Sequence, residues 1–269
     1  DDDLEPVSGE VGDGLRQPPY LRLPSTNRCD ALGGPLGRNI MKKVSVLLLS
    51  LLVSVSAAAQ MASVSVWQIA PGRNQEALAM ARMMAPVIAE ISDSQLSVAI
   101  DQFNRLHWVQ VYENWEDWGK SGDAWATDNS EKFAEVRANF PRTTPPLTTL
   151  VDRFEINIVK PSDPNFKANV TSVTKWDAQP GRLQESIANG RKFVDAHEKL
   201  GSSVSISADA FGNSYYALNF ESFTAMGQWI EKSRASEEIR SIMASMADQE
   251  RVAEVAARWR IRWIVRPGI

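Results

Sequence analysis

The sequence predicts an α+β protein made of two tandem β-α-β-β-α-β units. The first observation is an internal repeat, because the run W-x-x-x-P-G-R-x-Q-E begins at Trp67 and begins again at Trp176. Agreement at six of these ten positions is hard to obtain by chance, so the two runs mark the same point in two copies of one unit. The second observation is that the same order of predicted strands and helices surrounds each run.

Hydrophobic periodicity identifies the elements of the first copy. Leu96, Val98 and Ile100 alternate with other residues as in a strand, whereas Leu78 and Ala81 are spaced as on one face of a helix. A proline at position 86 is expected to kink or shorten that helix. In chain order we expect a strand at 63–69, a helix at 74–90, a hairpin at 96–101 and 106–113, a broken helical segment at 115–127 and 130–140, and a strand at 148–159.

A linker at 160–169, which contains two prolines, separates the predicted repeats at 60–159 and 170–269. The last strand of the second repeat alternates arginine with apolar residues, which is typical of an exposed edge strand guarded by charge. The elements of the second copy are expected at 171–176 (strand), 183–200 (helix), 204–209 and 214–220 (strands), 223–250 (helices) and 258–265 (strand).

A β-α-β-β-α-β unit packs both helices on one face of a four-stranded antiparallel sheet, the ferredoxin-like arrangement. The other face of each predicted sheet is also apolar, so two units in one chain can bury these faces against each other as an intrachain pseudo-dimeric barrel. With this element order and the W-x-x-x-P-G-R repeat, residues 62–266 resemble the dimeric α/β-barrel superfamily. They are similar to NIPSNAP and antibiotic biosynthesis monooxygenase domains. We expect a monomer with pseudo-two-fold symmetry or a homo-oligomer.

Residues 41–59 are predicted to be a signal peptide. A short positive start at Met41 precedes a run of about a dozen apolar residues, and an A-x-A site ends at Ala59. The apolar run is too short to cross a bilayer, so we expect cleavage before Gln60, a periplasmic or secreted protein and no stable membrane anchor. Residues 1–40 are expected to be disordered and absent from the mature protein. They contain Cys29, so the mature chain would have no disulfide and no thiol nucleophile.

Composition and motifs exclude several classes of function. The net charge is −4, so no basic field favours nucleic acid. The sequence contains no glycine-rich phosphate loop, no H-E-x-x-H and no G-x-S-x-G, so no metal site and no nucleotide cofactor are predicted. Equivalent polar residues are interpreted as structural: Arg73 and Arg182 as salt-bridge partners, and Asp101 and Asp209 as turn residues that bond their own backbone.

The candidate ligand-binding residues are aromatic residues and the two histidines. Any single aromatic residue on a strand or helix is more often part of the core. His197 replaces Ile88 of the first copy on an apolar helix stripe, where a hydrogen-bonded core histidine is favoured over a cavity acid, base or ligand. Three tryptophans at 115, 118 and 125 are spaced along one helix, which exceeds the usual needs of packing. The candidates are Trp67, His107, Tyr112, Trp115 and Trp118 in the first copy, and Trp176, His197 and Tyr215 in the second.

The predicted signal peptide implies export. The aromatic residues and the resemblance together imply binding of a small, mainly aromatic ligand, on which the protein would act as a cofactor-independent monooxygenase or isomerase. The alternative is a non-enzymatic periplasmic binding or assembly module. Haem binding through His107 or His197 is a third hypothesis. Haem-degrading members of the superfamily carry a haem-ligating histidine in the helical segment after the tryptophan that Trp115 matches, and this sequence has no histidine there. An aromatic-lined cavity of roughly a few hundred cubic ångströms between sheet and helices would favour ligand binding. A filled interior in both halves would contradict the oxygenase hypothesis.

Overall fold

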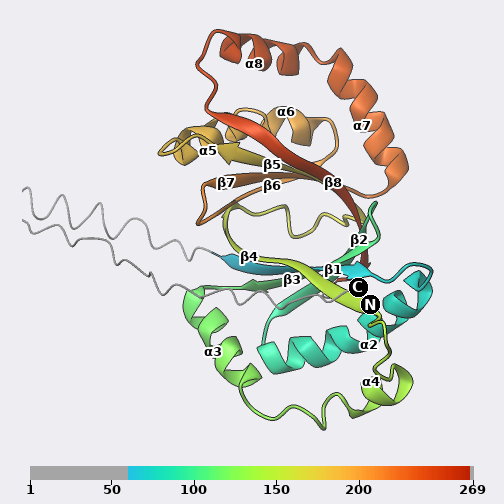
Figure 1. The fold of residues 1–269 in the computed structure, drawn as a ribbon. Helices are drawn as coiled ribbons and strands as arrows, with labels where there is room; N and C mark the ends of the chain where they lie inside the picture. The colour runs from blue at the N-terminus through green and yellow to red at the C-terminus, as the bar shows by residue number, and fades with distance from the viewer. Residues whose placement is uncertain (1–59, 267–269) are drawn as a thin grey trace, which may run out of the picture. The chain divides into compact units, whose positions relative to one another are not determined.

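The computed structural model describes residues 60–266, which form one closed β-barrel with helices on its outer surface (Figure 1). The predicted signal peptide and the stretch 1–40 lie outside the described residues. Among the helices of the described part, none has the length and apolar character needed to cross a membrane. The strands are β1 (Met61–Ile69), β2 (Gln95–Asp101), β3 (Arg105–Tyr112), β4 (Thr148–Lys160), β5 (Val170–Ala178), β6 (Ser203–Asp209), β7 (Asn213–Phe220) and β8 (Ala253–Val265). The helices are α2 (Asn74–Ser92), α3 (Trp115–Trp125), α4 (Ala134–Asn139), α5 (Leu183–Arg191), α6 (Val194–Lys199), α7 (Phe223–Ala235) and α8 (Glu237–Ala247).

The strand order corresponds to two ferredoxin-like sheets joined at their edges. Around the barrel the order is β1-β3-β2-β8-β5-β7-β6-β4, and neighbouring strands are antiparallel. The first copy contributes β4-β1-β3-β2 and the second contributes β8-β5-β7-β6, in the same internal order. The predicted fold class, two tandem β-α-β-β-α-β units in an intrachain pseudo-dimeric barrel, is confirmed.

Two pairings between the copies close the barrel. β2 pairs with the end of β8, where Asp101 lies opposite Ile261, and β4 pairs with β6, where Ile156 lies opposite Asp209. Each sheet thereby buries the face that its own helices leave uncovered, which supplies apolar burial that one four-stranded sheet lacks.

Apolar side chains fill the space between the first sheet and α2. Leu78 and Ala81 are buried on one face of the helix, as the periodicity predicted, and they pack in one cluster with Leu106 and Trp108 of β3. Successive residues of a strand point to opposite faces. Since Leu106 and Trp108 face the helix, His107 between them faces the barrel interior.

The two Pro-Gly-Arg turns have the same conformation. Gly72 has a φ angle of 76° and Gly181 of 80°, in the left-handed region that favours glycine. In each copy the arginine then pairs with the glutamate three residues further on, as Arg73–Glu76 and Arg182–Glu185. The repeated motif is therefore a structural strand-to-helix turn.

Three details differ from the predictions. The helix expected at 183–200 is broken into α5 and α6, because the N–H groups of Lys192 and Phe193 bond carbonyls three residues back rather than four. The last strand is not an edge strand over its predicted length, because β8 pairs with β5 over 253–262 and with β2 over 261–265, so that barrel closure covers its end. Only its preceding extension, 253–260, pairs with β5 alone. The proline at position 86 does not shorten α2, which continues to Ser92.

Substitution of Ile261 tests the closure of the barrel. Ile261 is 5% exposed and lies between β2 and β5, so Ile261→Ala should lower the free energy of unfolding by about 2–5 kcal/mol through lost burial and a cavity. Urea unfolding measures this loss. Phe211→Ala, at a side chain that is 84% exposed, is the control and should stay within about 0.5 kcal/mol of the wild type. Equal small losses in both variants would contradict the closed barrel.

Candidate functional site

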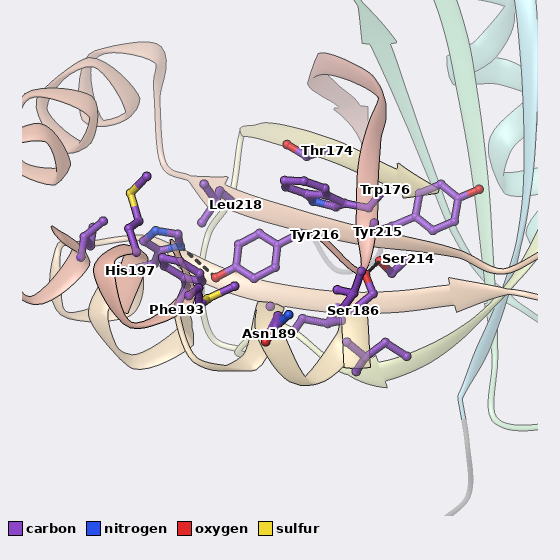
Figure 2. A pocket seen from close by; sticks show the side chains of 18 of the residues that line it. Thr174, Trp176, Ser186, Asn189, Phe193, His197, Ser214, Tyr215, Tyr216 and Leu218 are labelled. Carbon is purple, nitrogen blue, oxygen red and sulfur yellow. Dashed lines mark hydrogen bonds between the residues drawn. The ribbon is translucent and has the colours of Figure 1, made fainter. Parts of the chain in front are cut away.

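A cavity of about 760 Å³ lies between the second sheet and helices α5 to α8 (Figure 2). We call it the second-half pocket. This volume is within the range of small-molecule sites. Its aromatic and polar lining includes Trp176, Ser186, Phe193, His197, Ser214, Tyr216 and Trp229.

The pocket lies in the second half partly because a small side chain occupies a position that a large one fills in the first half. Ser214 stands at the position of Leu106, and Ser186, at the position of Ala77, adds a hydroxyl beside it. The two serine hydroxyls lie 2.9 Å apart and bond each other, so each buried polar group has a partner. An unpaired buried hydroxyl would cost about 1–3 kcal/mol.

Gly190 determines how close the ring of Tyr216 lies to α5. A Cβ atom at this position would lie 3.3 Å from the ring, which is tighter than an ordinary contact. The first half has Ala81 at the equivalent position. The absence of a side chain at Gly190 therefore provides space for Tyr216 beside the helix.

His197 and Tyr216 form a hydrogen-bonded pair in the pocket wall, with 2.8 Å between the imidazole Nδ1 and the phenol oxygen (Figure 2). Burial lowers the pKa of His197 to about 4, and burial together with the charge of Glu198 raises the pKa of Tyr216. Both groups are therefore neutral near pH 7. Whichever group donates, the pair keeps one further donor and one further acceptor for another molecule.

Aromatic contacts hold the imidazole of His197 in place. Phe193 stacks on it with 5.6 Å between ring centroids, and the ring of Trp229 meets it edge-on at 5.0 Å. The indole N–H of Trp229 donates to the His197 carbonyl oxygen. His197 is thus both a hydrogen-bonded packed histidine and part of a cavity wall.

Helix α8 and the loop after it supply flexible and charged side chains to the same pocket. Met243 and Met246 line it from α8, and thioether side chains adapt well to irregular ligands. Glu250 also borders the pocket and forms a 2.7 Å salt bridge with Arg182 of the repeated turn. This bridge fastens the loop after α8 to the start of α5.

The first-half aromatic candidates do not meet in one site. Trp67 is partly buried and packs against the filled core under α2. Tyr112 borders a separate polar pocket, where its hydroxyl lies 3.1 Å from that of Ser121. Among the candidates, only Trp176, His197 and Tyr215 border the second-half pocket.

Trp115 and Trp118 lie on the outer surface of α3 and line neither described pocket. They are 46% and 37% exposed and meet edge-to-face at 5.4 Å. The indole N–H of Trp115 donates to the side chain of Asn157. Trp125 stacks separately on Phe133. A count of tryptophans along a helix therefore did not locate a cavity.

His107 and Tyr215 face the barrel interior from equivalent positions. His107 Nε2 lies 3.0 Å from Asp101, and the Tyr215 hydroxyl donates to Asp209 at 2.8 Å. Figure 2 shows the Tyr215 ring pointing away from Tyr216, so Tyr215 borders the second-half pocket only through its strand. Trp259 packs against both residues, in a stack with His107 and edge-on to Tyr215.

Both aspartates bond their own backbone, as predicted for turn residues. Asp101 accepts from the N–H groups of Phe103 and Arg105, and Asp209 accepts from the equivalent N–H groups of its turn. Burial alone would raise the pKa of Asp101, but hydrogen bonds from His107 and Arg105 outweigh it and hold this pKa at about 2. The carboxylate is charged at neutral pH and fixes the turn.

The sequence candidates omitted residues that shape the second-half pocket. Tyr216, Gly190 and the two serines were not among them because each residue type is common in cores and turns. The signal that identifies them is a comparison of the two copies, since apolar residues of the first copy become small or polar in the second. Within residues 60–266, no group of three or more histidine, cysteine, aspartate or glutamate side chains is placed to hold a metal ion.

The lowered pKa of His197 should make the protein sensitive to mild acid. Below about pH 6.5 the unfolded chain binds a proton at His197 that the folded chain does not accept until about pH 4. Stability should therefore fall as pH decreases through this window. His197→Ile, which copies Ile88, has no titrating group at this position. The unfolding free energy of this variant should therefore vary less between pH 6.5 and 4 than that of the wild type. Urea unfolding across this range measures it, and equal pH dependence in the two proteins would contradict the assignment.

Comparisons with known proteins show the fold. No protein-family model and no curated protein matches the chain. A candidate monooxygenase from Fusobacterium nucleatum subsp. nucleatum ATCC 25586 matches with a TM-score of 0.53 and 11% identity, over 78% of this chain and 94% of that chain. A candidate monooxygenase from Lactobacillus acidophilus NCFM matches with a TM-score of 0.50 and 10% identity, over 77% and 95%.

A haem-binding protein from Thermus thermophilus matches with a TM-score of 0.41 and 11% identity, over 76% of this chain and 91% of that chain, a likeness too low to bear on function. The first two matches show the fold alone at these identities. The chain has the α/β-barrel fold of these two structures, with both halves of the barrel in one polypeptide.

Proposed function

We propose that this chain is an exported protein that binds a small, mainly aromatic ligand in the second-half pocket. The observation that carries the proposal is the difference between the halves. The first sheet packs a filled core under α2, whereas the equivalent layer of the second sheet has a cavity of about 760 Å³. Loss of packing contacts around a cavity lowers the stability of the fold. A cavity of this size is therefore better explained as a site for a ligand than as imperfect packing.

The chemistry of the lining indicates the class of ligand. Trp176, Phe193 and Trp229 offer ring faces and edges, which suit a planar aromatic molecule. His197 and Tyr216 are neutral and together offer one donor and one acceptor, which suit a hydroxyl or carbonyl group on that molecule. We therefore expect an uncharged hydroxylated or oxo-substituted aromatic ligand.

The same pair is suited to cofactor-independent oxygenase or isomerase chemistry. A neutral imidazole can accept a hydrogen bond from a bound phenol, and the tyrosine hydroxyl can stabilise an oxyanion on the ligand by hydrogen bonding. The matches to candidate monooxygenases favour this possibility. The alternative is a non-enzymatic binding module, in which the same contacts only hold the ligand.

Haem binding is less favoured. His107 is bonded to Asp101 inside the barrel and lines neither described pocket. His197 already uses Nδ1 with Tyr216 and is enclosed by two aromatic rings.

Ligand binding is tested with 1-naphthol as a neutral aromatic probe. We expect the wild type to bind it with a Kd of roughly 10–100 µM by isothermal titration calorimetry. The double variant Ser186→Ala/Ser214→Leu copies Ala77 and Leu106 of the first half. The leucine side chain should occupy the part of the cavity beside Trp176, so it should weaken binding at least about tenfold.

Trp67→Phe is the matched control, because Trp67 is the first-half equivalent of Trp176, and it should keep wild-type affinity. Equal affinity in the double variant would show that the probe binds elsewhere. Oxygen uptake with bound 1-naphthol above the uncatalysed rate, lost in His197→Ile, would favour the oxygenase, whereas binding without turnover would favour the binding module.

Export is a second part of the proposal and rests on the predicted signal peptide. When the chain is produced from Met41 onward in a bacterium with a secretory pathway, the exported fraction should begin at Gln60, because the A-x-A site ends at Ala59. Intact-mass spectrometry of the periplasmic fraction measures this. Ala57→Glu/Ala59→Glu, which removes the small residues that cleavage requires, should leave the precursor uncut. A wild-type chain that remains in the cytoplasm at full length would contradict export.

A further inference from the structure

A second pocket, of about 560 Å³, lies in the first half between the end of α2, the end of β3 and α3. We call it the first-half pocket. Most of its lining side chains are polar, in contrast to the aromatic lining of the second-half pocket. It has no part in the function proposed above.

The first-half pocket exists because a tryptophan of the second half has a small counterpart. Trp229 of α7 meets Phe220 of β7 edge-to-face, whereas the equivalent residues are Ser121 and Tyr112. The Trp229 indole reaches the His197 carbonyl, but the equivalent carbonyl of Ile88 accepts instead from Ser92. The volume of the Trp229 indole is thus left open in the first half.

Buried hydroxyl groups form the floor of this pocket. Ser121 and Tyr112 are each 5% exposed, and their hydroxyl oxygens lie 3.1 Å apart. Only one of the two protons is used in that bond, so the other remains available to a bound molecule.

The electrostatic environment of the pocket favours a cation. Its lining contains the carboxylates of Asp93, Glu113 and Asp117 and one ammonium group, that of Lys120. Lys120 is already bonded to Asp117 and to Glu116 on its own helix. The carboxyl end of the 19-residue helix α2 also borders the pocket, and its last turn has no basic residue. The negative end of a helix dipole attracts positive charge.

We propose that the first-half pocket is a binding site for a small organic cation that carries an ammonium group. The carboxylates of Asp93 and Glu113 and the end of α2 attract the ammonium group, and the Ser121 and Tyr112 hydroxyls bond a polar part of the same molecule. Gln60 also lines the pocket, so the ammonium group comes either from a free amine or from the chain's own amino terminus if cleavage creates it there.

The test uses 1,4-diaminobutane on the full chain, with neutral 1,4-butanediol as the matched probe. We expect the diamine to bind with a Kd below about 1 mM by calorimetry and the diol to give no measurable binding. Ser121→Trp copies Trp229 and fills the pocket, so it should abolish diamine binding without loss of thermal stability. Asp93→Asn and Glu113→Gln should each weaken binding about threefold to tenfold.

Glu131→Gln removes the same charge from a residue that does not line the pocket, so it should bind the diamine as the wild type does. Equal binding of diamine and diol, or an unchanged affinity in Ser121→Trp, would overturn the proposal. None of these variants touches the second-half pocket, so 1-naphthol binding reports separately on the proposed function.

A second arm distinguishes the two sources of the ammonium group. In the processed protein from the exported fraction, a terminus that occupies the pocket should weaken diamine binding at least about fivefold and raise the α-amino pKa above its usual range of about 7.7–8.0. Ser121→Trp should return that pKa to the usual range. Unchanged diamine affinity after processing would identify a free amine as the ligand. The site would be overturned if the full chain did not bind the diamine and the processed protein had an ordinary α-amino pKa.

Discussion

The structure depends on one constraint: each four-stranded sheet has helices on only one face and must bury the other. The seams between β2 and β8 and between β4 and β6 satisfy it, because each joins a strand of one copy to a strand of the other. The shared interior is then occupied by His107, Tyr215 and Trp259, which pack against one another. Volume for ligands is therefore available mainly in the layers between each sheet and its own helices, and both described pockets lie there.

Duplication allows the two outer layers to specialise. In the first half, Leu106 and Trp108 pack under α2 and leave no room beside the middle of the sheet. In the second half, that space is open, but Trp229 fills the region that is open in the first. Each half thus keeps part of its core and gives up another part, and the shared barrel supplies burial that compensates for either loss. In each pocket the buried or partly buried polar side chains are paired, as Ser186–Ser214, His197–Tyr216 and Tyr112–Ser121, which avoids the cost of unsatisfied groups.

The sequence predicted the barrel well because element order, periodicity and the repeated turn are local signals. It could not predict the break after Arg191, since the stripe from Leu183 to Leu200 has helical spacing throughout. It also could not predict which half holds a cavity, because cavity volume depends on the sum of side chains from several elements. Of the positions that differ between the copies, His197 borders the second-half pocket, whereas the tryptophans of α3 lie on a surface.

Differences between the copies do not all have the same meaning, and the barrel interior shows why. Asp101 and Asp209 each use one carboxylate oxygen for two backbone N–H groups of the turn. The other oxygen is shared by the side chain four residues on and by the inward-facing residue, His107 in one copy and Tyr215 in the other. Exchange of histidine for tyrosine there preserves the network and the packing on Trp259. Exchange of leucine for Ser214, or of tryptophan for Ser121, instead changes the volume between sheet and helix. The asymmetry that bears on ligand binding is therefore in the outer layers, and equivalent positions that differ in volume are stronger indicators of a site than positions that differ only in polarity.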